Sequence, residues 1–96
     1  MAAYVIAQVT VNDPVRYADY RAMVPASLEA YGGKFVARGG KTEVLEGEYD
    51  LPERFVIMEF PSVERAKEWW SSEEYREAKE LRQAISNGVL IVTEGI

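Results

Sequence analysis

The 96-residue sequence contains neither cysteine nor histidine. Without cysteine there is no disulfide framework, no thiolate nucleophile and no sulfur ligand for zinc or iron. Without histidine the chain lacks the commonest general base and the commonest metal and haem ligand, and a Ser-His-Asp triad is excluded. Any chemistry must use Asp, Glu, Tyr, Arg, Lys, Ser or a borrowed cofactor. We predict neither a bound metal nor a resident cofactor.

The sequence also lacks a basic excess and a long apolar run. Its formal charge of −5 and pI near 4.7, with scattered lysines and arginines, argue against nucleic acid as a partner. No apolar run approaches the ~20 residues that span a bilayer. The start, MAAYVIAQVTVN, lacks the basic region and cleavage site of a secretory signal. We therefore expect a soluble, cytoplasmic protein with neither nucleic acid nor a membrane as a partner.

The length predicts one domain over residues 1–96. A chain this short buries only about 60 to 70% of its unfolded surface when it folds alone, so a partner would help it complete a core.

The first third of the chain predicts a strand followed by a helix. Residues 3–11 are rich in β-branched side chains, and Asp13 and Pro14 then suit a helix start. Residues at spacings of three and four form one helical face, which ends at Gly32-Gly33: Tyr17, Tyr20, Val24, Leu28 and Tyr31. Because Pro25 cannot bond to the Arg21 carbonyl, we predict a kink or a restart there.

The rest of the chain predicts two strands, two helical segments and a final strand. Residues 34–38 and 42–46 flank two glycines and read as one bent or bulged strand, followed by a loop over 48–53 and a strand over 54–60. Ser62 caps the next helix, and Ser71 or Ser72 breaks and recaps it. Ser71 with Glu74 fits a capping box that opens another helix. Asn87-Gly88 should end that helix before a strand over 89–93.

This βαββαβ order predicts a ferredoxin-like α+β fold, an antiparallel sheet with both helical segments on one face. The strand segments 5–7, 55–58 and 89–92 are apolar on both faces, whereas a sheet with one wet face should alternate. No residues remain for a third layer. We therefore predict a homodimer in which two sheets pack face to face. The alternative is short strands with a few exposed Val and Ile.

Three segments resemble one bacterial family, domain of unknown function 1330, within the dimeric α/β-barrel superfamily. They are VNDPVRYADYRAMVP (11–25), YGGKFVARGG (31–40) and RFVIMEFPSVERAKEWWSSEEY (54–75). The resemblance implies the ferredoxin-like fold and dimerisation. The superfamily also contains cofactor-independent monooxygenases, lactone isomerases and haem-handling enzymes, which place small molecules in a cavity between the sheet and the helices. Such an analogy of fold is weak support for any activity.

Three charged residues are candidates for ligand binding. Arg82 lies seven residues after Tyr75 on one helical face, where it is either an anion clamp or a structural arginine that reaches the rim or pairs with a core carboxylate. Arg38 ends a strand and would meet a ligand carboxylate or pair with Glu46 or Glu59. Glu59 would act as a base in a buried strand or be neutralised by an arginine.

Aromatic residues supply the remaining candidates. Tyr20, Trp69, Trp70 and Tyr75 would line a pocket for a flat apolar ligand or simply pack in the core. We therefore predict a small-molecule-binding homodimer whose ligand is aromatic or carboxylate-bearing. The alternatives are a cofactor-independent monooxygenase or isomerase, and a non-catalytic dimeric interaction module whose cavity is filled by side chains.

Overall fold

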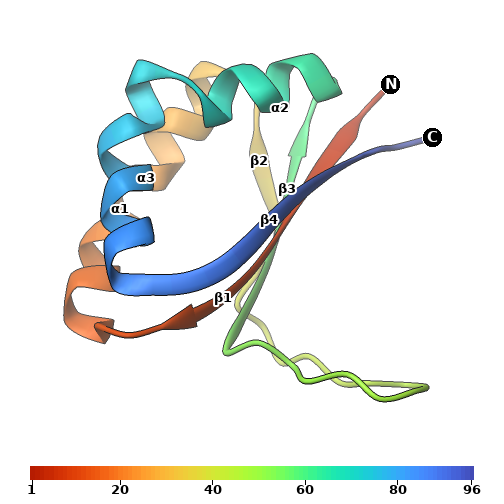
Figure 1. Ribbon diagram of the computed structural model, residues 1–96. Helices are drawn as coiled ribbons and strands as arrows, with labels where there is room; N and C mark the ends of the chain where they lie inside the picture. Colours follow the sequence, from red (N-terminus) through yellow and green to blue (C-terminus); the bar gives the residue numbers. More distant parts are fainter.

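A four-stranded antiparallel sheet organises the chain, and three helices pack on one of its faces (Figure 1). The computed structural model describes all residues from Met1 to Ile96. The strands are β1 (Ala3–Val11), β2 (Lys34–Arg38), β3 (Arg54–Phe60) and β4 (Ser86–Glu94), in the order β2-β3-β1-β4. The helices are α1 (Pro14–Ala30), α2 (Val63–Trp70) and α3 (Glu73–Ile85). The predicted ferredoxin-like fold is confirmed. No helix is both long enough and apolar enough to span a bilayer.

The core lies between the helices and the inner face of the sheet, the face that the helices cover. Alternate residues of the two central strands point inward, with Val5 opposite Met58 and Ala7 opposite Val56. The three helices contribute mostly apolar and aromatic side chains: Tyr17, Tyr20, Val24, Leu28, Ala66, Trp69, Tyr75, Ala78 and Ile85.

Each helix begins at a side-chain oxygen that accepts a backbone N–H. Asp13 caps α1 through the Arg16 N–H (3.2 Å), and Ser62 caps α2 through the Arg65 N–H (3.1 Å). The cap of α3 is Ser72, which accepts from the Tyr75 N–H at 3.1 Å, so the predicted capping box starting at Ser71 is wrong. The Ser71 hydroxyl instead donates to the Lys67 carbonyl at the end of α2.

Helix α1 continues through Pro25 without the predicted restart. Proline leaves the Arg21 carbonyl without its usual helical donor. The Arg38 Nη2 of β2 donates to that carbonyl at 2.8 Å. A side chain from the edge strand thus replaces the missing helical hydrogen bond.

Two predicted strand boundaries are wrong. Residues 42–46 are not a strand but part of a loop over residues 39–53, which we call the arm. Gly39, with φ +71°, turns the chain out of the sheet at the start of this loop. The predicted bulge occurs, but within β2, between Phe35 and Ala37. Strand β4 starts at Ser86, directly after α3, so Asn87 and Gly88 lie in the sheet rather than at a helix stop.

The outer face of the sheet, which no helix covers, is largely apolar. Ile6, Ile57 and Ile91 pair across three strands on this face, with Phe55 and Val89 beside them. Val89 is 56% exposed and Ile91 48%. The prediction that the strands are apolar on both faces is confirmed.

Gly88 allows β4 to approach β1 closely. A Cβ at this position would lie 2.8 Å from the Gln8 carbonyl oxygen, so Gly88→Ala forces the strands apart. We expect it to lower the free energy of unfolding by about 1–3 kcal/mol in urea denaturation. Gly40→Ala, where a Cβ would meet nothing within 4 Å, is the matched control. Equal stability of the two variants would contradict this role.

Candidate functional site

Two adjoining hollows form a groove between the helices α2 and α3 and the edge strand β4. The first, of about 180 Å³, is apolar and includes Val5, Ala66, Trp69 and Val92 in its walls. The second, of about 380 Å³, is polar. Apart from Trp70 and Leu90, its walls consist of Arg82, Gln83, Ser86, Asn87 and Gly88. Trp70 and Leu90 line both hollows, so the two adjoin. We call this feature the β4 groove.

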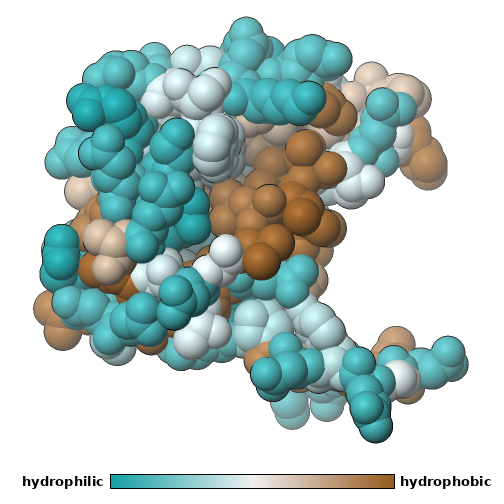
Figure 2. Space-filling model, viewed as in Figure 1, coloured by the Kyte–Doolittle hydropathy of each residue, from teal (hydrophilic) through white to brown (hydrophobic).

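The β4 groove exists because the helices leave part of the inner face uncovered. Leu90 and Val92 pair with Ala7 and Val5 and therefore point to the helix side of the sheet. Val92 nevertheless remains 36% exposed. Figure 2 shows apolar surface open to solvent beside the hydrophilic helices in this region. The groove thus offers apolar surface at one end and hydrogen-bonding groups at the other.

A hydrogen-bonded network from α1 and α3 connects the core to the polar end of the groove. The hydroxyls of Tyr20 and Tyr75 lie 2.9 Å apart, and the Arg82 Nε donates to the Tyr75 hydroxyl at 3.4 Å. The Trp69 ring stacks on Tyr75 with centroids 4.1 Å apart, and its Nε1 donates to the Ser27 hydroxyl at 3.0 Å. Side chains from all three helices therefore position the Tyr75 hydroxyl, to which Arg82 is hydrogen-bonded.

Arg82 is buried without an acidic partner. It is 6% exposed, and no carboxylate lies within 4.0 Å of its guanidinium. The predicted alternative of a structural ion pair is therefore absent. Burying an unpaired cation is costly, and the neutral phenol of Tyr75 only partly offsets that cost. The polar end of the groove consequently has a cation suited to an anionic group.

Two other candidate residues lie away from the groove. Arg38 is on the opposite edge strand, stacks over Phe35 at 4.1 Å and forms no pair with Glu46 or Glu59. Glu59 is on the outer face, where it pairs with Lys34 at 3.5 Å rather than with an arginine. The structure thus brings together Tyr20, Trp69, Tyr75 and Arg82. It places Glu59 on the outer face, and Arg38 in a cavity that it shares with Tyr20 but with none of the other three.

The β4 side of the groove was missed from the sequence. Leu90 and Val92 were visible as apolar strand residues, but not as residues left uncovered by helices. Asn87 and Gly88 were assigned to a helix end, which hid their place in the groove. No group of three or more acidic, His or Cys side chains is arranged to hold a metal ion.

A comparison with protein-family models matches residues 2–96 to the family described as Domain of unknown function (DUF1330). The chain belongs to this family. A comparison with curated proteins finds no match.

Solved structures share the fold. A protein of unknown function from Rhodopseudomonas palustris is 26% identical and has a TM-score of 0.78, with 99% of this chain and 82% of that chain covered. A dimeric ferredoxin-like protein of unknown function from Jannaschia sp. CCS1 is 10% identical, with a TM-score of 0.77 and coverage of 99% and 100%. SnoaB, a cofactor-independent oxygenase from Streptomyces nogalater, is 14% identical, with a TM-score of 0.68 and coverage of 99% and 93%.

Burial of the Tyr20 phenol, together with the neighbouring Tyr75, raises the pKa of Tyr20 well above that of an exposed tyrosine. Below about pH 10 this phenol is protonated in both states and contributes no pH dependence. Above that pH the unfolded chain loses the proton and the folded chain keeps it. We expect the free energy of unfolding to fall with pH, by up to about 1.4 kcal/mol per unit, more steeply than in Tyr20→Phe.

Urea denaturation between about pH 10 and 12 measures this difference. Parallel curves for the unmodified protein and Tyr20→Phe would show that the phenol ionises equally in both states.

Proposed function

We propose that the protein is a homodimer that binds, in the β4 groove of each subunit, a small molecule with an apolar body and an anionic group. The observation that carries this proposal is the buried, acid-free Arg82 at the end of an apolar hollow. Small-molecule sites typically combine apolar walls with a few fixed polar groups. An aromatic or aliphatic body would lie along Trp69, Trp70 and Leu90 while its anion meets Arg82.

The open groove favours binding over a purely structural role. A non-catalytic interaction module was predicted to have its cavity filled by side chains, whereas both hollows here are open. The likeness to SnoaB supports the fold and not a reaction, because the identity is 14% and one fold hosts many activities. Binding is therefore the function that the geometry supports best.

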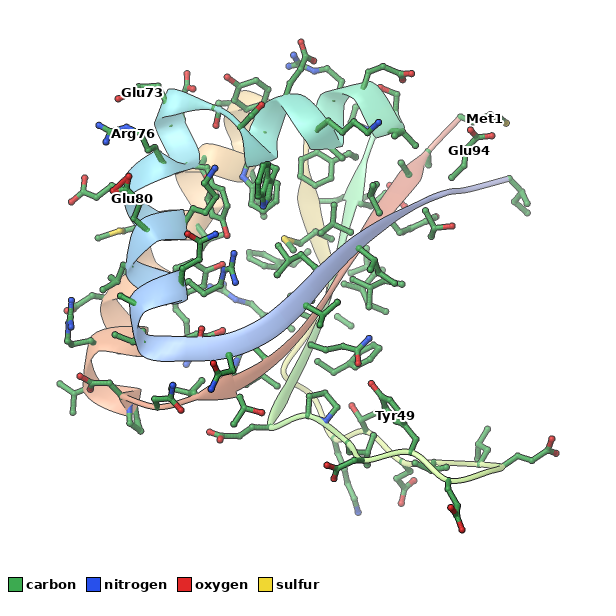
Figure 3. All side chains as sticks on the ribbon, viewed as in Figure 1. Met1, Tyr49, Glu73, Arg76, Glu80 and Glu94 are labelled. Atoms are coloured by element: carbon green, nitrogen blue, oxygen red, sulfur yellow. The ribbon has the colours of Figure 1, made fainter.

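The outer face and the arm support the homodimer. The outer face carries Ile6, Ile57 and Ile91, and an apolar patch of this kind on a soluble protein marks an interaction site. The arm projects beyond this face, with Leu45 98% exposed (Figures 1 and 3). Tyr49 joins it to the sheet through a hydrogen bond to Gln8. A second copy packed on the face would cover both, and two solved structures of this fold are described as dimeric.

Binding of 2-naphthoate tests the groove, because this probe combines a flat apolar body with a carboxylate. We expect it to alter the fluorescence of Trp69 and Trp70. Arg82→Met, which keeps the apolar stem, should weaken binding by about 10- to 100-fold, the equivalent of a charged hydrogen bond. Binding of the neutral 2-naphthalenemethanol should change by less than about threefold, since it has no charge to lose.

Arg76→Met is the matched control on the same helix. Its side chain points to solvent and pairs with Glu73 at 2.9 Å and Glu80 at 3.7 Å (Figure 3). Equal losses for the charged and the neutral probe in Arg82→Met would identify a purely structural arginine and contradict the proposal.

Ile57→Lys tests the dimer, because it places a charge at the centre of the outer face opposite Ile6. We expect sedimentation equilibrium to give twice 10.8 kDa for the unmodified protein and 10.8 kDa for the variant. Val15→Lys, on the exposed side of α1, should leave the mass unchanged. A monomeric unmodified protein at micromolar concentration would contradict the homodimer.

A further inference from the structure

Three arginines without acidic partners meet at the β2 edge of the sheet, the edge opposite the β4 groove. Arg21 comes from α1, Arg38 ends β2 and Arg54 begins β3. All three line one cavity of about 20 Å³ between α1 and the inner face. Residues distant in the sequence thus bring three positive charges to one place.

Contacts with the surrounding residues hold two of these guanidinium groups in position. Arg38 donates to the Arg21 carbonyl at 2.8 Å. The Arg54 Cζ lies 5.5 Å from the centre of the Tyr17 ring. Gly39 leaves space for Arg54, since a Cβ at Gly39 would lie 2.6 Å from the Arg54 Nη2. The positions of both groups follow from packing and not from pairing with an acid.

No carboxylate balances the cluster. None lies within 4.0 Å of Arg21, Arg38 or Arg54, although the arm that begins beside them carries five acidic residues: Glu43, Glu46, Glu48, Asp50 and Glu53. The Arg54 Nε is fully buried and has no hydrogen-bond partner. Desolvation, followed by repulsion from Arg21 and Arg54, lowers the pKa of Arg38. A buried donor without an acceptor and repelling like charges both cost stability.

An anion would remove both costs. Planar guanidinium groups bind carboxylate and phosphate oxygens through paired N–H donors, and three of them around one cavity provide more donors than one oxyanion requires. The cavity itself is too small for the body of a ligand or for a whole phosphate, so the anion would bind at its opening, beside the exposed Arg21 and Arg38, with an oxygen directed toward Arg54.

We infer that Arg21, Arg38 and Arg54 form a second binding site, for a phosphate or carboxylate group of a small molecule. The site is separate from the β4 groove, but a chain of hydrogen bonds joins them. Tyr20 lines this cavity and bonds to the Tyr75 hydroxyl, which accepts from Arg82 in the β4 groove. Its existence does not depend on the function proposed for the groove.

Calorimetric titration of the purified protein with inorganic phosphate, at pH 7 and fixed ionic strength, tests the site. We expect phosphate to bind, and Arg54→Gln and Arg21→Gln each to weaken it about tenfold or more. Arg16→Gln, on the exposed side of the same helix as Arg21, is the control and should bind like the unmodified protein. A parallel titration with acetate, which has no apolar body for the β4 groove, distinguishes a phosphate from a carboxylate as the better ligand.

Two results would overturn the inference: binding of neither anion, or equal affinity in all variants. Arg21→Gln keeps the test decisive if Arg54→Gln fails to fold, because the Arg21 side chain is exposed and makes no hydrogen bond within the protein. Arg82→Met should retain full phosphate affinity. A loss of phosphate binding in Arg82→Met would assign the anion to the β4 groove instead.

Discussion

The stack of Trp69 on Tyr75 is the contact on which the arrangement of the helices depends. Trp69 comes from α2 and Tyr75 from α3, and their polar atoms bond to Ser27 and Tyr20 of α1. Both rings are fully buried, so the two hydrogen bonds satisfy groups that would otherwise be costly in the core. With the three helices fixed in this way, Arg82 is held at the rim of the β4 groove, and the inner face beside it stays open.

The sheet imposes a second constraint, because its strands are apolar on both faces while all helices lie on one. The inner face is covered over β1 and β3 but not at the edge strand β4, where the groove forms. No helix covers the outer face, which is the proposed dimer surface. Because the three helices cover only part of the sheet, both the proposed ligand site and the proposed dimer surface stay uncovered.

Much of the fold followed from the sequence because local signals were strong. Asp13 and Ser62 gave the starts of two helices, and the apolar strand segments gave the sheet and its second face. The errors arose where a local signal competed with tertiary contacts. Asn87-Gly88 resembles a helix stop, but Gly88 is required by the close approach of the β1 backbone. Residues 42–46 were predicted to continue a bent or bulged strand, but positive φ at Gly39 leads them away from the sheet. Glu59 lies between two apolar neighbours in the sequence, and only the paired strands show that it faces outward.

Pro25 has a consequence for how the chain folds. Because its ring removes one helical donor, the middle of α1 is incompletely bonded until Arg38 of β2 reaches the Arg21 carbonyl. Arg21 and Arg38 are 17 positions apart and belong to different elements, so this hydrogen bond forms only when the edge strand β2 lies against α1. A proline that would ordinarily divide a helix into two locally stable pieces here ties its completion to the assembly of the sheet. Docking of β2 thereby stabilises the middle of α1.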